Sequence, residues 1–292
     1  MKTILKIQNT EKRVTELVEY LGRVVEAKKQ GRLKLRGRLG IADGFLHGRL
    51  GALILKRLVD HAYSSTNNID SSLSQLLLLM IERLQHAGPK RVDARTVQEW
   101  CVYTDASYEN TQESGGLGVV LIGPDGECAG WFSLRLSSDV CEALGSEEKE
   151  TIIYELELIA ACVALDVWSD ILSASYPIHY GDNDSVRFAL IRGTGLGLIA
   201  ETIMNLHLRN EVFYNSNVWF ARVPKEANIA DIPSRFEAHP VLQQSLDISS
   251  KANESLLKFF KEVSVARQNL HSKGGSATAS TSPSSKKRAA AS

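Results

Sequence analysis

Apolar side chains in the first third of the chain recur at helical spacing. Between residues 10 and 31 they repeat at intervals of three and four positions, which predicts an amphipathic helix that ends at Gly31. Residues 33–63 continue the pattern but contain five glycines. Each glycine costs a helix roughly 1 kcal/mol relative to alanine, so we expect these glycines to serve turns or close packing. Residues 71–86 predict a third helix that begins at a serine, so residues 1–95 are predicted to be mainly helical.

The pattern changes at Trp100 to short runs of β-prone residues. Residues 99–107, 115–123 and 128–137 predict three strands, and Pro-Asp-Gly at 124–126 predicts a hairpin turn between the last two. Residues 147–172 predict a single helix of more than twenty residues, followed by a strand within 177–184, helices over 184–192 and 196–210, and a strand over 217–224. This order predicts an α/β domain over 96–246, in which a mixed five-stranded sheet is flanked by helices.

Composition adds the remaining boundaries. A C-terminal helix is predicted over 247–273, and the low-complexity residues 274–292 predict a disordered tail.

The four cysteines show no Cys-x-x-Cys spacing, which favours buried free thiols over a disulfide framework or a zinc site. The N-terminus lacks the apolar segment of a secretion signal, and the Leu-rich run at 76–81 is far shorter than a membrane span. We therefore expect an intracellular protein with no membrane partner, without a choice between cytoplasm and nucleus.

A formal net charge of zero conceals an uneven distribution. Residues 1–62 hold 14 Lys or Arg against 6 Asp or Glu, residues 63–246 hold 12 against 25, and residues 247–292 hold 8 against 3. A basic arm and a basic tail therefore flank an acidic body. Such asymmetry suits a body that gathers cations and flanks that touch phosphates.

Acidic residues stand at the ends of separate predicted elements. Asp105 ends the first strand, Asp182 follows the fourth, Asp231 follows the last, and Glu155 or Glu157 lies in the first half of the long helix. If the first and fourth strands are neighbours, their C-terminal ends meet at one edge of the sheet, where ligand sites tend to lie. A single Asp at a strand end is most often a turn former, but four converging carboxylates require a cation.

Carboxylate oxygens at an open site are the ligands that Mg2+ or Mn2+ prefers. Two such ions about 3.5 to 4 Å apart activate a water molecule and stabilise the leaving oxygen in phosphodiester cleavage. The acidic group therefore predicts a two-metal site for phosphodiester chemistry.

Four short motifs give the chain a specific resemblance. YTDAS at 103–107 precedes a glycine-rich hairpin, ELELIAA lies on the long helix, a DN pair follows a strand, and AN-x-AD-x-PSR follows the last strand. Together they resemble ribonuclease H of type 1, particularly the shortened form fused to the reverse transcriptases of retroelements. The resemblance implies an RNase H-like fold, two Mg2+ ions for which Mn2+ can substitute, and endonucleolytic cleavage of the RNA strand of an RNA-DNA hybrid.

The resemblance also assigns the acids of the site, at Asp105, Glu157, Asp182 and Asp231. Asp105 is the candidate to bridge both ions, and Asp231 is the candidate for the most labile ligand. Glu155 lies two positions before Glu157, so the two side chains point about 200° apart on a helix and only one should reach the metals. The residues that follow favour Glu157, and the DN spacing favours Asp182 over its competitor Asp184.

The resemblance extends upstream of the α/β domain. Residues 34–58 look like the thumb and connection helices that follow the palm in these reverse transcriptases, where such helices grip the template and primer duplex. The sequence contains no YxDD-type polymerase motif. We therefore expect the C-terminal part of a larger polymerase, which cuts but does not copy nucleic acid and has the polymerase portion as a possible partner.

Two departures from the family affect substrate binding. The loop at 223–231 lacks the histidine that cellular ribonucleases H carry there, and the nearly neutral residues around 193–201 replace a basic protrusion. Substrate contacts are then expected from the basic N-terminal arm, with Lys34, Arg36, Arg38 and Arg49 as candidates for phosphate binding.

Two other functions fit the same sequence. One is a catalytically inactive retroelement remnant that keeps the fold and binds nucleic acid without cutting it. The other is a nuclease of the same fold that acts on DNA.

Overall fold

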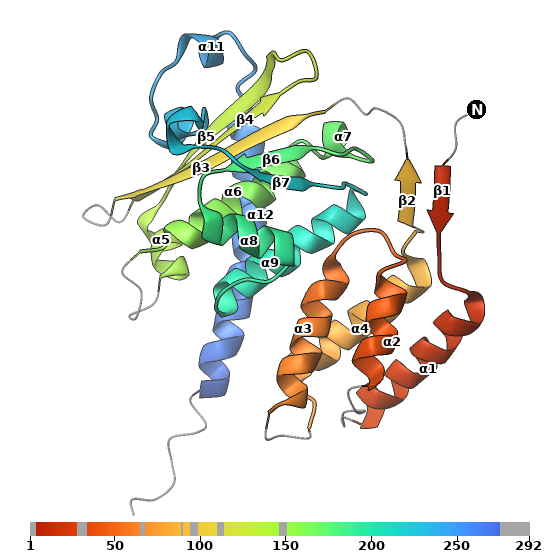
Figure 1. Cartoon of the computed structure of the whole chain (residues 1–292). Helices are drawn as coiled ribbons and strands as arrows, with labels where there is room; N and C mark the ends of the chain where they lie inside the picture. Colours follow the sequence, from red (N-terminus) through yellow and green to blue (C-terminus); the bar gives the residue numbers. More distant parts are fainter. Residues whose placement is uncertain are drawn as a thin grey trace, which may run out of the picture.

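Four helices form the N-terminal part of the chain in the computed structural model, which describes residues 4–27, 34–64, 68–88, 90–93, 99–109, 114–145 and 151–274. The helices are α1 (Glu11–Ala27), α2 (Lys34–Asp43), α3 (Leu50–Ala62) and α4 (Ser71–His86). Helix α1 packs on α4, and α2 and α4 both pack on α3 (Figure 1). Their apolar faces meet in a core whose fully buried members include Leu17, Leu21, Ile54, Leu77 and Met80.

The glycines of residues 33–63 serve a turn and a close contact, as predicted. The chain leaves the helical conformation after α2, and Gly48 adopts a positive φ of 76°, a conformation that favours glycine. A Cβ atom on Gly51 would lie 2.0 Å from Cγ of Asp43, so only glycine fits where α3 begins. The continuous helical pattern therefore divides into two helices.

Two short strands modify the prediction of a mainly helical N-terminal part. Strand β1 (Ile4–Ile7) pairs antiparallel with β2 (Lys90–Asp93), in a register that sets Ile4 opposite Asp93 and Ile7 opposite Lys90. The four helices lie between these strands in the sequence. Because the two partners are so distant along the chain, neither strand has a local turn signal that would identify it.

A mixed five-stranded sheet follows, as predicted. Strands β3 (Cys101–Glu109), β4 (Ser114–Ile122) and β5 (Cys128–Leu136) form an antiparallel meander, with a turn at 123–126 between the last two. Strands β6 (Ile178–Gly181) and β7 (Trp219–Arg222) run parallel to β3, and the sheet order is β5-β4-β3-β6-β7. The carboxyl ends of β3 and β6 therefore point to the same edge of the sheet.

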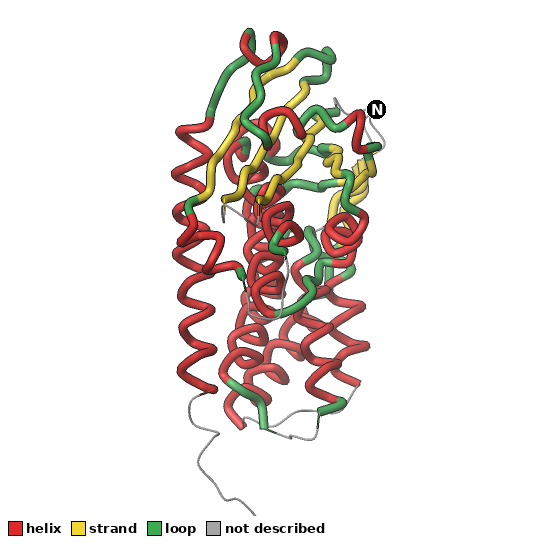
Figure 2. The backbone as a smooth tube through the Cα atoms, turned by 90° about the vertical axis from the view of Figure 1, so that its left-hand side faces the viewer, coloured by secondary structure: helices red, strands yellow, loops and turns green. Residues whose placement is uncertain are grey.

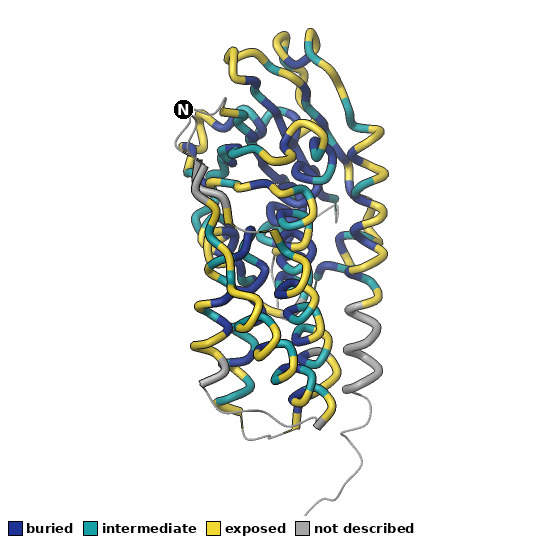
Figure 3. The backbone as a smooth tube through the Cα atoms, turned by 90° about the vertical axis from the view of Figure 1, so that its right-hand side faces the viewer, coloured by how far each residue is buried: buried dark blue, intermediate teal, exposed yellow. Residues whose placement is uncertain are grey.

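Helices α6 (Ile153–Val167), α8 (Asp184–Arg192) and α9 (Leu198–Phe213) cover one face of the sheet (Figure 1). Helix α12 (Ser249–Gly274) packs on α6, α9 and β5. Figure 2 shows the strands gathered at one end of the molecule with long helices running away from them, and Figure 3 shows the buried residues concentrated where helices and sheet meet. The other face of the sheet carries α10 (Asp231–Ser234), which follows the 3-10 turn Lys225–Ala227, and α11 (Pro240–Gln243) packs on β5.

The long helix predicted over 147–172 is shorter than expected. Residues 146–150 lie outside the described part of the chain, α6 begins at Ile153, and the helix breaks at Trp168 before α7 (Ser169–Leu172). Trp168 leaves the helical conformation, with φ −101° and ψ 25°, while its ring stacks on Phe132 of β5 at 5.6 Å. A short helix, α5 (Ser138–Leu144), occupies the preceding polar stretch because it buries Cys141 and Leu144.

The four cysteines are free thiols, as predicted, and two of them, Cys141 and Cys162, are buried. Among the described residues, no helix combines the length and the apolar character needed to cross a membrane. The predicted C-terminal helix corresponds to α12, and the predicted disordered tail lies outside the described residues, apart from Gly274.

Candidate active site

Asp105 lies within β3, opposite Gly118 of β4. The prediction that it ends the first strand is wrong, because pairing with β4 continues the strand to Glu109. Its side chain is nearly buried, with 6% of its surface exposed, and Oδ2 accepts a 2.6 Å hydrogen bond from Oγ of Ser234. Burial raises the pKa of Asp105 to about 6, the hydrogen bond from Ser234 opposes this rise, and the charges of Asp182 and Asp231 add to it. Asp105 is therefore a desolvated carboxyl within electrostatic range of two other predicted site residues.

Glu157 occupies the second turn of α6 and reaches the same group. It is 8% exposed, and Nδ2 of Asn183 donates a 3.0 Å hydrogen bond to its Oε1. Burial raises the pKa of Glu157 to about 8, and the charges of Asp105 and Asp182 contribute to the shift. Glu155, the alternative in the sequence, is fully buried and does not contribute to the pKa shift of Asp105 or Glu157. Glu157 is therefore the member of the pair that faces the other acids.

Asp182 follows β6 directly and is partly exposed. The parallel register sets Tyr103 opposite Tyr180. Asp105 lies two residues after Tyr103 on β3, and Asp182 lies two residues after Tyr180, just past the end of β6. The competing Asp184 turns away, since its Oδ1 accepts bonds from Arg187 at 3.1 and 2.8 Å. Its other carboxylate oxygen lies 3.8 Å from Nε of Arg222. Asp182 is therefore the acid of the DN segment that joins the group.

Asp231 opens α10 on the opposite side of the group. Its Oδ1 accepts a 2.9 Å hydrogen bond from Nε of Arg235, four residues later, in a pair whose side chains are 34% and 46% exposed. The charge of Asp231 contributes to the raised pKa of Asp105. Asp231 is thus close enough to repel Asp105, but its hydrogen bond goes to a cation of its own helix.

Two glycines of β4 determine how closely α10 packs on the sheet. A Cβ on Gly116 would lie 2.0 Å from the carbonyl oxygen of Ser234, and a Cβ on Gly118 would lie 2.2 Å from the Ser234 backbone nitrogen. Real Cβ contacts of this length do not occur, so the backbone of α10 can approach the sheet only over glycine. The alternating glycines of the predicted hairpin are the sequence signal for this close approach.

Hydrogen bonds hold α10 in this position against the sheet. Ser107 and Ser133 donate at 2.6 Å to the carbonyl oxygens of Ser234 and Pro233, and Nδ2 of Asn228 donates at 3.0 Å to the carbonyl oxygen of Thr104. Ser234 itself is completely buried. Ser234 and Arg235, which belong to the motif AN-x-AD-x-PSR, both contact an acid of the site.

The donor set matches the chemistry of a hard divalent cation, since it consists of carboxylate oxygens from β3, α6, the end of β6 and α10. Within the described ranges, however, no three His, Cys, Asp or Glu side chains form a group that could hold a metal ion as they stand. Asp105, Glu157 and Asp231 are instead hydrogen-bonded to Ser234, Asn183 and Arg235. Closing the group around an ion therefore requires side-chain rotation, most simply of the half-exposed Asp231.

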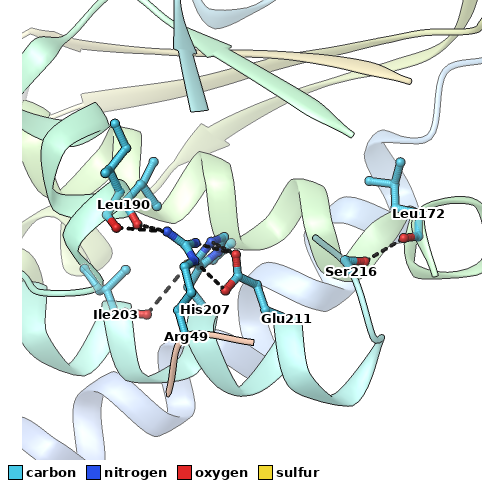
Figure 4. A network of polar contacts seen from close by, with 9 residues as sticks. Arg49, Leu172, Leu190, Ile203, His207, Glu211 and Ser216 are labelled. Atoms are coloured by element: carbon cyan, nitrogen blue, oxygen red, sulfur yellow. Dashed lines mark hydrogen bonds and ion pairs between the residues drawn. The ribbon is translucent and has the colours of Figure 1, made fainter. Parts of the chain in front are cut away.

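Arg49, predicted to bind phosphate, makes internal contacts (Figure 4). Its Nε donates to Oε2 of Glu211 at 3.1 Å, its Nη2 pairs with Oε1 of the same carboxylate, and its Nη1 bonds to the carbonyl oxygens of Leu190 and Ile191. The guanidinium also lies 4.8 Å from the centre of the Phe220 ring. The Arg49 guanidinium therefore joins the helical part to the sheet domain through internal hydrogen bonds, and phosphate binding by Arg49 stays a prediction.

The other predicted phosphate ligands lie on α2. Arg38 is half exposed and its Nη2 forms a 3.0 Å ion pair with Oε2 of Glu16. Arg36 is exposed. Lys34 begins α2, but its side chain lies outside what the structure describes. Arg36 and Arg38 therefore stay candidates, on a helix separate from the acidic group.

Comparison with known proteins found no matching family model and no matching curated protein. Among solved structures, the chain is similar to RNase H1 from the halophilic archaeon Halobacterium salinarum NRC-1, with a TM-score of 0.33 and 17% identity over 45% of this chain and 90% of that one. LC11-RNase H1, isolated from compost by a metagenomic approach, gives a TM-score of 0.36 and 18% identity, over 47% of this chain and 92% of that one.

The N-terminal RNase H domain of rv2228c from Mycobacterium tuberculosis, solved as a fusion with maltose binding protein, gives a TM-score of 0.36 and 12% identity, over 48% of this chain and 99% of that one. Each of these likenesses covers less than half of the present chain. The fold and the candidate site rest on the strand topology and the residues described above.

Proposed function

We propose that the chain is a metal-dependent endonuclease that cuts the RNA strand of an RNA-DNA hybrid. The observation that supports this proposal is the convergence of acids from four separate elements of the sheet domain. The charges of Asp182 and Asp231 raise the pKa of Asp105, and those of Asp105 and Asp182 raise the pKa of Glu157. Buried carboxylates that repel one another are costly unless a cation or a proton offsets their charge. Pairs of perturbed acids of this kind are typical of functional sites.

In the proposed reaction the four acids would hold two Mg2+ ions, for which Mn2+ can substitute. When bound, such ions lower the pKa of the attacking water and stabilise the departing 3′ oxygen. Asp105 is central among the acids, since it repels Glu157 and is repelled by Asp182 and Asp231. Ser234 and Asn183 orient the carboxylates of Asp105 and Glu157 through their hydrogen bonds.

The products follow from the bonds that change. The water oxygen forms a bond to phosphorus, the bond from phosphorus to the 3′ oxygen breaks, and a proton is taken up by that oxygen. The fragments then carry a 3′-hydroxyl and a 5′-phosphate. Choice of the RNA strand would come from the A-like geometry of the hybrid and from the 2′-hydroxyl groups, which distinguish RNA from DNA.

A polymerase portion of a reverse transcriptase is the proposed partner. Support for this partner comes from the sequence resemblance of residues 34–58, which form most of α2 and α3 and the turn between them. Arg36 and Arg38 on α2 are the proposed phosphate contacts of this part.

A second candidate function is a nucleic-acid-binding module that no longer cuts. It is favoured by one specific observation, the ion pair in which Arg235 engages the carboxylate of Asp231. A permanent pair of this kind would leave the group of acids one ligand short.

Cleavage of a labelled RNA-DNA hybrid by the full chain in Mg2+ tests the proposal, with duplex DNA and duplex RNA as alternative substrates. We expect the hybrid to be cut in its RNA strand, and Asp105→Asn to abolish cleavage. Asp184→Asn is the matched control, because Asp184 faces Arg187 and Arg222 and should be dispensable. Full activity of the Asp105 variant, or equal loss in both variants, would contradict the assignment.

A further inference from the structure

We propose that Arg235 is a built-in counter-ion that holds Asp231 apart from the other acids until a substrate phosphate takes over its guanidinium. This inference rests on the proposed function and extends it, because it makes metal binding at Asp231 depend on substrate. Arg235 acts through Asp231 and is therefore a positioning residue.

The charge of Arg235 contacts Asp231 and also influences Asp105. Its hydrogen bond to Asp231 is 2.9 Å long, and this bond, followed by the charges of Asp231 and Asp105, raises the pKa of the guanidinium. Conversely, Arg235 is the nearby cation that opposes the upward pKa shift of Asp105. A positive charge supplied by the chain itself thus already offsets part of the repulsion among the carboxylates.

The backbone on both sides of Arg235 is anchored. Ser234, which precedes it, is fully buried and bonded to both Asp105 and the carbonyl oxygen of Asp231. Phe236, which follows it, has a positive φ of 63°, a conformation disfavoured for a bulky residue. The guanidinium of Arg135 lies 4.0 Å from the centre of the Phe236 ring and packs on it. These two anchors hold the backbone at Arg235 beside the acids, while its side chain stays exposed enough to change partner.

Exposure distinguishes this pair from the two buried acids, Asp105 and Glu157. Asp105 and Glu157 are buried, whereas Asp231 and Arg235 keep 34% and 46% of their side chains exposed. An exposed ion pair contributes little to stability, so exchange of its partner costs little. The planar guanidinium binds phosphate oxygens in the same bidentate manner as carboxylates. A backbone phosphate of the hybrid is therefore the partner that can draw Arg235 away and free Asp231.

Binding of Mn2+ alone to the full chain, measured by calorimetry or by electron paramagnetic resonance, tests this inference without any cleavage. Arg235→Gln removes the charge at nearly constant size. We expect this variant to bind Mn2+ about fivefold more tightly than the wild type, the lower end of ordinary coupling between sites. Adding Asp231→Asn to Arg235→Gln should abolish the gain.

Two control variants separate the effect from a loss of structure. Arg235→Lys retains the charge and should bind Mn2+ as the wild type does. Arg187→Gln removes the similar ion pair with Asp184 on α8 and should leave Mn2+ affinity unchanged, because that pair lies outside the acidic group. A gain in affinity cannot arise from unfolding, so the expected result stands apart from a structural defect.

Coupling to substrate provides the second measurement. A hybrid whose RNA strand is blocked by 2′-O-methylation should raise the Mn2+ affinity of the wild type about fivefold and leave that of Arg235→Gln unchanged. Equal or weaker Mn2+ binding by Arg235→Gln, while the wild type binds Mn2+ in an Asp105-dependent manner and cuts the hybrid, would overturn the role of Arg235 and leave the proposed function intact. Absence of Asp105-dependent Mn2+ binding in every variant would overturn both.

Discussion

Ser234 joins the first strand of the sheet to α10, because its hydroxyl donates a 2.6 Å hydrogen bond to Asp105. The same hydroxyl lies 2.9 Å from the carbonyl oxygen of Asp231. One buried side chain therefore sets the position of the central acid relative to the turn that carries the most exposed one. The distance between these two acids depends on how closely α10 can approach β4.

Replacing Gly118 by alanine tests this dependence. The new Cβ would lie 2.2 Å from the backbone nitrogen of Ser234, so α10 must move away from β4. We expect a loss of about 1 to 3 kcal/mol in the free energy of unfolding and a fall in hybrid cleavage of at least roughly tenfold. Gly181→Ala is the control, since a Cβ there has no neighbour within 4 Å. Wild-type cleavage by the Gly118 variant would refute the role assigned to the close packing of α10 on β4.

Asn183 has two roles that substitutions can separate. Its side-chain oxygen caps α8 by accepting from the backbone nitrogens of Ser185 and Val186, and its Nδ2 donates to Glu157. Asn183→Ser keeps a good cap but is too short to reach Glu157, whereas Asn183→Ala loses both interactions. We expect cleavage to fall in both variants. The free energy of unfolding should fall only in the alanine variant, by about 1 kcal/mol. Equal cleavage by the serine variant and the wild type would argue against the positioning role.

Glu157 makes the metal-free protein sensitive to pH. Its pKa is raised from an ordinary 4.5 to about 8 in the folded state, so folding favours the protonated form. The stability that this proton contributes is complete below about pH 4 and is lost as the pH rises through 8. Asp105 has the same sign of shift, from 3.8 to about 6.

Glu157→Gln should therefore stabilise the metal-free protein at alkaline pH. We expect its free energy of unfolding at pH 8 to exceed that of the wild type by about 2 kcal/mol or more, since one pKa unit corresponds to roughly 1.4 kcal/mol. The difference should vanish at pH 4. Urea unfolding in chelator at the two pH values measures both quantities. Asp184→Asn serves as the control, and a similar gain in that variant would show that the effect is not specific to Glu157.

The ion pair between Arg49 and Glu211 should stabilise the junction between the helical part and the sheet domain. Glu211 is 1% exposed, and its carboxylate is held by the Arg49 guanidinium. Arg49→Met would leave this buried charge without its cation and should cost about 3 to 5 kcal/mol of stability. Replacing Glu211 by Met as well should recover most of that loss, because a buried ion pair can be exchanged for apolar side chains at little cost.

The matched control for the junction is Arg38→Ala. Arg38 forms a surface ion pair with Glu16, so its loss should cost less than about 1 kcal/mol. Denaturant midpoints of the three variants measure these differences. An Arg49 variant as stable as the Arg38 variant would mean that the internal pair does not hold the two parts together.

Sequence reasoning located the acids by element but could not settle their local partners. The end of β6 and the motif on α6 predicted where Asp182 and Glu157 lie because both depend on short-range patterns, whereas Asp105 lies within β3 and not at its end. The choice between Asp182 and Asp184 depends on Arg187 and Arg222, and Arg222 comes from a strand much later in the chain. The contact with Arg187 spans only three residues of α8, but the contact with Arg222 leaves no trace in the spacing of nearby residues.

The same limit explains why the sequence did not show the internal partners of Arg49 and why two strands were missed. The Glu211 partner of Arg49 lies 162 residues away, and β1 finds its partner only after four helices. A basic residue in a basic segment is reasonably expected to meet phosphate, and its pairing with a distant carboxylate cannot be read from that segment. The domain boundaries and the reverse transcriptase partner stay predictions.

The packing of α10 on the glycines of β4 affects when, during synthesis of the chain, the group of acids can be completed. Asp105 belongs to the first strand of the sheet, whereas Ser234 and Asp231 arrive with a segment that follows the last strand. A growing chain can therefore fold β3, β4 and β5 on the ribosome while its cluster of acids is still incomplete. The proposed nuclease would stay silent during translation and become competent to cut only after residue 236 has emerged from the exit tunnel.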